Sequence, residues 1–108
     1  MDMAEGLQIF EELKKTKHSL LFDKMVRCAV IYARIRAEWY FSKSQQKNDM
    51  NDERTMAHDE FIHSYKMLCE KMEETGEDTA WKYAVGFDRR SIGDFACMIH
   101  AFIGIMAR

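Results

Sequence analysis

The chain has 108 residues, of which 47% are hydrophobic and 31% charged, and its formal net charge is −2. This length suits one domain that folds without disulfides or a structural metal, and the apolar content excludes an intrinsically disordered chain. Because proline is absent and only five glycines occur, few residues interrupt helices, and we expect a single all-α domain over residues 1–108.

The first half of the chain predicts two amphipathic helices. The first covers residues 4–17, and Ser19 follows it as a possible N-cap, although the two helices could also run together through a bend. The second shows the strongest helical spacing in the chain, with steps of four and three along Leu21, Met25, Cys28, Tyr32, Ile35 and Trp39. Beside this row lies another, formed by Phe22, Val26, Ala29, Ala33 and Ala37. Such a wide apolar arc is typical of a central bundle helix and is consistent with a homodimer.

The polar segment 42–52, SKSQQKNDMND, lacks apolar periodicity and is rich in side chains that compete for backbone hydrogen bonds. We therefore expect the main loop here, with Asn51 or Asp52 capping a third helix that runs to about residue 74. The apolar row of this helix comprises Phe61, Tyr65, Leu68 and Met72, with Ile62 and Cys69 beside it. Gly76 is expected to close the helix in the left-handed conformation.

After Gly76 the sequence predicts a short helix over 80–85, closed by Gly86, and a last helix from residue 88 to the C-terminus. Trp81 is expected to anchor the short helix to the core. Gly93 and Gly104 each weaken the last helix by about 1 kcal/mol relative to alanine, which suggests that another backbone comes close there. The predicted fold is an up-and-down four-helix bundle with one extra short helix between the third and the last.

The cysteines and the charge pattern indicate the environment and the class of partner. Three widely spaced cysteines among apolar neighbours predict reduced core thiols and a cytoplasmic protein. The N-terminus lacks a secretory pattern, and no apolar stretch is long enough to span a membrane. Nucleic acid is not the expected partner, because basic residues form no dense stripe; the residues that would carry such binding are Lys14, Lys15, Lys17, Lys24, Arg27, Arg34 and Arg36.

Glu60 and His63 form the sharpest candidate for metal chemistry, because residues three apart on a helix share one face. Bundles that hold paired metals use two such motifs with two further glutamates, and only one motif is present. His58 lies five positions before His63 and therefore on a different face. Metal or small-ligand binding is the alternative function, but the expectation is no metal and no cofactor.

A polar cluster could form between the third and last helices from Arg54, His58, Arg89, Arg90 and Asp94. If the last helix starts near Arg54, these side chains could hold an anionic ligand or a carboxylate of a partner. The competing interpretation is a network of caps and ion pairs around a helix start.

Trp39, Tyr40 and Phe41 are consecutive aromatic residues on a helix, so they cannot all point inward. At least one is expected at a subunit or partner interface. Cys97 and His100 are the best placed pair for nucleophilic catalysis, but Cys97 falls within an apolar row. With no complete catalytic set, the sequence predicts a non-enzymatic interaction module, namely an adaptor, regulator or inhibitor that docks a helical face on a partner protein.

Several segments of the C-terminal half resemble a group of small uncharacterised helical proteins of Gram-positive bacteria and their phages. These segments are RTMAH at 54–58, Trp81, GFDRRSIGDFAC at 86–97, and the closing Ala107 and Arg108. The resemblance covers roughly half of the chain. It implies a small bacterial or phage-related protein and carries over no activity.

Overall fold

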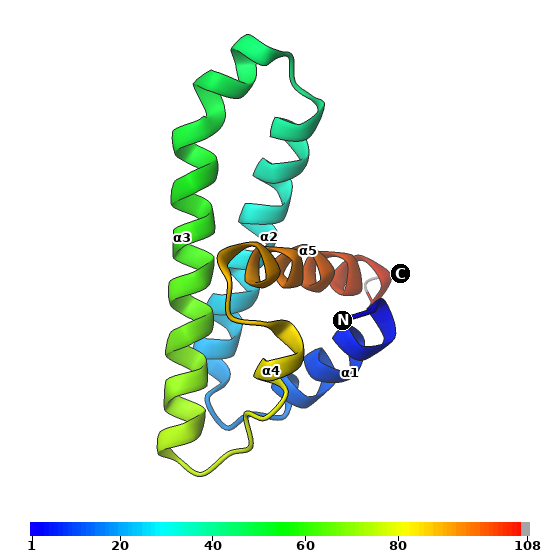
Figure 1. The fold of residues 1–108 in the computed structure, drawn as a ribbon. Coiled ribbons are helices and arrows are strands. Elements are labelled where there is room, and N and C mark those ends of the chain that lie inside the picture. The colour runs from blue at the N-terminus through cyan, green and yellow to red at the C-terminus, as the bar shows by residue number, and fades with distance from the viewer. Residues whose placement is uncertain (107–108) are drawn as a thin grey trace.

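The structure is a computed structural model that describes residues 1–106 and contains five helices and no strand within that range (Figure 1). The helices are α1 (Met3–Lys14), α2 (Ser19–Phe41), α3 (Ser44–Glu74), α4 (Lys82–Val85) and α5 (Arg89–Met106). The predicted all-α bundle, with four main helices and a short extra helix between the third and the last, is confirmed. Ala107 and Arg108, which contribute to the resemblance, lie outside the described residues.

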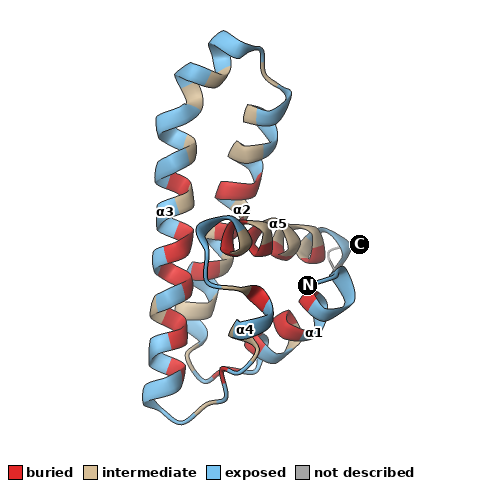
Figure 2. Cartoon of the chain, viewed as in Figure 1, coloured by how far each residue is buried: buried red, intermediate tan, exposed pale blue. Residues whose placement is uncertain are grey.

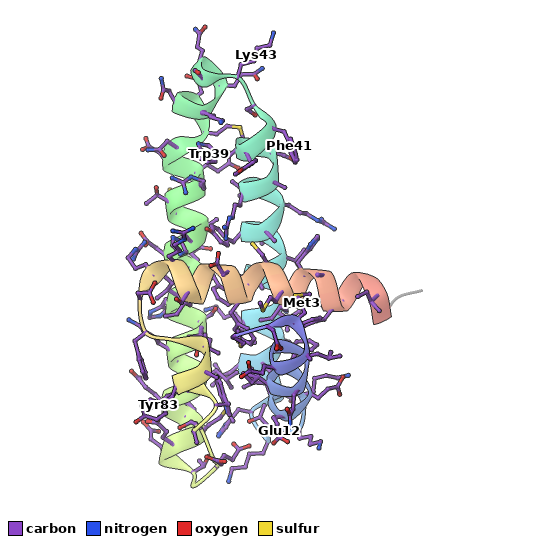
Figure 3. All side chains as sticks on the ribbon, turned by 45° about the vertical axis from the view of Figure 1, so that its right-hand side comes forward. Met3, Glu12, Trp39, Phe41, Lys43 and Tyr83 are labelled. Carbon is purple, nitrogen blue, oxygen red and sulfur yellow. The ribbon has the colours of Figure 1, made fainter. Side chains whose placement is uncertain are left out.

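A long antiparallel hairpin of α2 and α3 forms the frame of the molecule (Figure 1). The molecule is 47 Å long, which is close to the length of about 46 Å that 31 helical residues span at 1.5 Å each. Helix α5 runs across this hairpin, and α1 packs on α5 and the first half of α2 (Figures 1 and 3). One end of the hairpin therefore extends beyond α5 without a covering helix.

The core lies on the side of α5 where α1 and α4 also pack (Figure 2). Its most deeply buried large side chains are Leu13, Met25, Phe61, Leu68, Phe95 and Ile99. The predicted row of the third helix is entirely buried, as are the first four members of the row along the last helix, Ile92, Phe95, Ile99 and Phe102. At the other end of the hairpin, most residues are exposed or half-buried (Figure 2).

The predicted loop over residues 42–52 is wrong, because only Ser42 and Lys43 separate α2 from α3. The side chain of Gln46 accepts a hydrogen bond from the Lys43 amide and caps the start of α3. The side of α3 that meets α2 here follows steps of three and four along Lys47, Met50, Arg54, Ala57 and Phe61, all half-buried or buried. Lysine and arginine bury their aliphatic stems while their charged ends stay in water, so this helical row was hidden in a segment counted as polar.

Helix α1 ends three residues earlier than the predicted boundary at 17, because the chain turns to meet the segment after α3. The Thr16 hydroxyl donates to Glu77 Oε2 at 3.1 Å, and the His18 amide donates to Thr16 Oγ1. These hydrogen bonds separate α1 from α2, so the two helices do not run together. Ser19 is the first residue of α2 rather than its cap.

The two turns around α4 contain glycines with positive φ, as the sequence predicts. Gly76 has φ of +79° after α3, and Gly86 has φ of +95° after α4. Helix α4 is shorter than expected, starting at Lys82, and Trp81 anchors it by packing edge-on against Tyr65 with ring centroids 6.0 Å apart. This connection brings the start of α5 back to the middle of α3, where the candidate site lies.

Candidate functional site

An open cavity of about 370 Å³ lies where the start of α5 meets the hairpin. Its lining contains four arginines, one histidine and three aromatic residues: Tyr32, Arg36, Trp39, Tyr40, Arg54, His58, Arg89 and Arg90. We call this cavity the arginine pocket. Six of these side chains come from α2 and α3 and two from the start of α5, and none of the lining residues is acidic.

His58 fixes the position of α5 against the hairpin. Its ring stacks on Tyr32 with centroids 4.7 Å apart and an interplanar angle of 13°. His58 Nε2 lies 2.9 Å from the carbonyl oxygen of Arg89, and because a carbonyl only accepts, Nε2–H is the donor. A side chain at Gly93 would collide with this ring, since a Cβ there would lie 2.8 Å from Nε2. A close approach exists at Gly93, but the side chains of His58 and Tyr32 make it rather than the predicted backbone. At Gly104 a Cβ would meet no atom of the described residues within 4 Å, so no close approach exists there in that part of the chain.

Arg54 lies over the face of Trp39, with its guanidinium carbon 4.4 Å from the centroid of the indole ring. Its Nη2 donates to the side chain of Asn51 at 3.1 Å. Its Nε is buried and has no hydrogen-bond partner among the described residues. A buried donor without an acceptor is unfavourable, so an acceptor brought next to this atom would stabilise it.

Ion pairs around the pocket engage two of its four arginines. Arg89 pairs with Asp59 on α3, and Arg36 Nη1 donates to Asp94 Oδ1 at 2.9 Å. Asp94 therefore pairs with Arg36 of α2 and not with Arg90, which lies one turn before it on α5. Among the described residues, no carboxylate forms an ion pair with Arg90. The network of caps and ion pairs is present, and an open basic cavity lies beside it. Binding of an anionic ligand there stays a prediction.

A second cavity, the α2–α5 groove, lies beside the arginine pocket and has a volume of about 520 Å³. Its lining comprises Ala33, Arg34, Arg36, Ala37, Glu38, Tyr40, Phe41, Cys97 and His100. Arg36 and Tyr40 line both cavities, so the two cavities lie next to each other. Tyr40 is 69% exposed and Phe41 is 87% exposed, with their rings edge-to-face at 5.9 Å.

The three consecutive aromatic residues thus divide between the interior and the surface. Trp39 is half-buried on the side of α2 that faces α3, while Phe41 lies on the outer side (Figure 3). Two of the three rings are exposed to solvent, so they are accessible to a partner, as the interface hypothesis requires. Their role in binding a partner stays a prediction.

Comparisons of this chain with protein families, with curated proteins and with solved structures found no match. Within the described residues, no helix combines the length and apolar character needed to cross a membrane.

The candidates for metal and nucleophilic chemistry are not assembled into sites within the described residues. Glu60 and His63 are both exposed, and the described part of the chain contains no group of three or more potential metal ligands. Burial raises the pKa of the Cys97 thiol, although the nearby Arg36 partly opposes this. A raised pKa lowers the fraction of reactive thiolate, so Cys97 is poorly suited to act as a nucleophile.

Six of the eight lining residues were predicted from the sequence as parts of two separate groups, the polar cluster and the aromatic trio, whereas Tyr32 and Arg36 were missed. Tyr32 was assigned to the core row of α2, where it is 3% exposed, and its ring still supports His58. Arg36 was considered only as a possible nucleic-acid contact. The signal for both was their spacing, because 32, 36, 39 and 40 follow one side of a helix.

Proposed function

We propose that this chain is a non-catalytic protein-interaction module that binds an acidic, amphipathic helical segment of a partner protein. One observation carries the proposal: Tyr40 and Phe41 hold two large rings in water at the edge of an open groove. Exposed aromatic side chains of this kind are enriched where proteins bind one another, because burying each ring in an interface is favourable.

The chemistry of the α2–α5 groove supports an acidic segment as the occupant. Ala33, Ala37 and Cys97 give part of its wall small or apolar side chains, which suit the apolar side of a helix. Arg34 forms no ion pair among the described residues, whereas Arg36 is paired with Asp94, and Glu38 is the one acidic residue of the lining. Carboxylates of the partner would therefore be attracted to this side of the groove.

The chain would act as an adaptor, a regulator or an inhibitor, since all three roles depend on docking to a partner protein.

The resemblance to small proteins of Gram-positive bacteria and phages supports a bacterial protein as the partner. A second copy of this chain is the competing occupant, and the experiment below separates it from a different protein.

The experiment uses a photo-crosslinking phenylalanine analogue in place of Phe41. The matched control carries the same analogue in place of Phe87, which is 62% exposed and pairs edge-to-face with Tyr83 at 5.3 Å, away from the groove. Both proteins are irradiated in a bacterial lysate, and the crosslinked segment is sequenced by mass spectrometry. The segment is then synthesised as a peptide and titrated into the unmodified chain.

The expected result is a crosslink from position 41, not from 87, to an acidic amphipathic segment. The double variant Tyr40→Ala/Phe41→Ala should weaken binding of the peptide at least about tenfold, since aromatic anchors often contribute 2 kcal/mol or more to an interface. The double variant Tyr83→Ala/Phe87→Ala should bind as the unmodified chain does. Crosslinking only to a second copy, or equal crosslinking from both positions, would overturn the proposal.

A further inference from the structure

The arginine pocket carries more positive charge than the neighbouring carboxylates balance. Four guanidinium groups line it, and Asp59 and Asp94 engage two of them. The nearby carboxylate of Asp88 accepts hydrogen bonds from the amide and the hydroxyl of Ser91, at 3.0 and 2.6 Å, as the cap of α5. These hydrogen bonds lower the pKa of Asp88 and the charge of Arg90 also helps to lower it, so this carboxylate partly balances Arg90. The wall of the cavity therefore keeps a net positive charge, but less than two full charges.

The donors left over in the pocket belong to Arg54 and Arg90. The Nε of Arg54 is buried without a partner, and Arg90 forms no ion pair among the described residues. A guanidinium group presents its donors in a planar fork that matches the oxygens of a phosphate. Two such groups on different helices can bind one phosphate from two directions.

The aromatic residues that line the pocket indicate what kind of group the bound phosphate is attached to. Tyr32, Trp39 and Tyr40 of α2 line this cavity of about 370 Å³. The Tyr32 ring is buried against His58 and the Trp39 ring lies under Arg54, so Tyr40, which is 69% exposed, is the ring most open to a ligand. A flat ring can stack on aromatic side chains, and an arginine can lie over a ring, as Arg54 already does over Trp39. This volume is within the range of pockets that take small molecules.

We propose that the arginine pocket binds a phosphate monoester carried on a flat ring. A phosphate monoester carries about −1.5 to −2 charges at pH 7 and has three acceptor oxygens, which suits a positively charged wall with the donors of Arg54 Nε and Arg90. This site shares Arg36 and Tyr40 with the groove, but phosphate binding does not depend on partner docking. It is measured on the chain alone, so the two proposals can fail separately.

The test is a calorimetric titration of the full chain with phenyl phosphate at low ionic strength, since salt screens these charges. Benzoate has the ring but a single charge, and inorganic phosphate has the charge but no ring. We expect phenyl phosphate to bind at least about tenfold more tightly than either compound, which corresponds to 1.4 kcal/mol. Equal affinity for phenyl phosphate and benzoate would overturn the proposal.

Variants separate a built site from general attraction to a basic surface. Arg90→Gln should weaken phenyl phosphate binding at least about tenfold without unfolding the chain, because the Arg90 side chain is exposed. Arg27→Gln is the matched control, since Arg27 is an exposed arginine of α2 that lies outside the pocket. Equal losses in the two variants would show non-specific binding and contradict the proposal.

Two further ligands distinguish the sources of such a group. O-phosphotyrosine represents a modified protein side chain, and adenosine monophosphate represents a nucleotide. Stronger binding of one identifies its source and supports the site. If phenyl phosphate, O-phosphotyrosine and adenosine monophosphate all fail to bind, the pocket is not a phosphate site.

Discussion

Gly93 of α5 lies directly against His58 of α3, so close that a Cβ at position 93 would be 2.8 Å from the imidazole Nε2 and 3.2 Å from the Tyr32 hydroxyl. This contact places the first turn of α5 beside α2 and α3. The missing side chain at Gly93 therefore allows three helices to meet at the arginine pocket.

Gly93→Ala should destabilise the protein by about 1–3 kcal/mol, the usual range for a side chain forced into a packed contact. The added methyl group must displace His58 or Tyr32, which hold the pocket in place. Urea denaturation gives the free energy of unfolding, and the NMR resonances of His58 report the local displacement. Unchanged stability together with unchanged His58 resonances would contradict this packing.

Gly104→Ala is the matched control on the same helix. A Cβ at position 104 meets no atom of the described residues within 4 Å, so the expected effect is the better helix propensity of alanine. Stability should rise by up to about 1 kcal/mol. A loss of stability here would show that the end of α5 packs differently.

Trp39→Ala should loosen the first turns of α3, because Lys47 and Arg54 both lie over the Trp39 ring, at 5.0 and 4.4 Å from its centroid. Cation–π contacts contribute about 0.5–1 kcal/mol each at exposed sites. Hydrogen exchange of amides 44–54 should become faster, while exchange around Phe61 changes little. Phe41→Ala should leave both regions unchanged, since Phe41 is 87% exposed; faster exchange there would argue against a specific role for Trp39.

Ser91→Ala should raise the pKa of Asp88. Hydrogen bonds from the Ser91 side chain and amide hold the pKa of this carboxyl below its usual range. A lowered pKa contributes stability above the unfolded value, and that contribution is lost as the pH falls through the folded value. NMR titration of Asp88 should show the rise in Ser91→Ala, and Asp88→Asn should remove the acid-dependent contribution while keeping a capping acceptor. An unchanged Asp88 titration in Ser91→Ala would contradict this cap.

Cys69→Ala should weaken the alkaline loss of stability. Burial raises the pKa of the Cys69 thiol from 9.0 to about 11, so the folded state favours the neutral thiol. Its contribution is present below pH 9 and is lost as the pH rises from 9 to 11. Since one pKa unit corresponds to about 1.4 kcal/mol, the loss is of the order of 2–3 kcal/mol. Urea denaturation at pH 8 and pH 11 measures it, and an equal loss in the variant would show that Cys69 is not responsible.

The amino-acid sequence by itself determined the helical class, the core rows and the glycines that end α3 and α4. These features depend on neighbours three or four residues away and on the conformations that glycine can adopt. Phe61, Tyr65, Leu68 and Met72 illustrate this, since their spacing on one helix was enough to predict burial.

Tertiary structure decided the start of α3 and the assembly of the arginine pocket. Judged from the sequence alone, Lys47 and Arg54 are polar residues without apolar periodicity. They become part of a packed row because both side chains lie over Trp39 on the neighbouring helix. Likewise, no spacing within α3 or α5 places Arg90 near Arg54. Arg90 comes near Arg54 because α5 crosses the hairpin at its middle. The contact of Gly93 with His58 and the turn that closes α4 place α5 there. Such long-range contacts fix the positions of helices, which local spacing in the sequence leaves open.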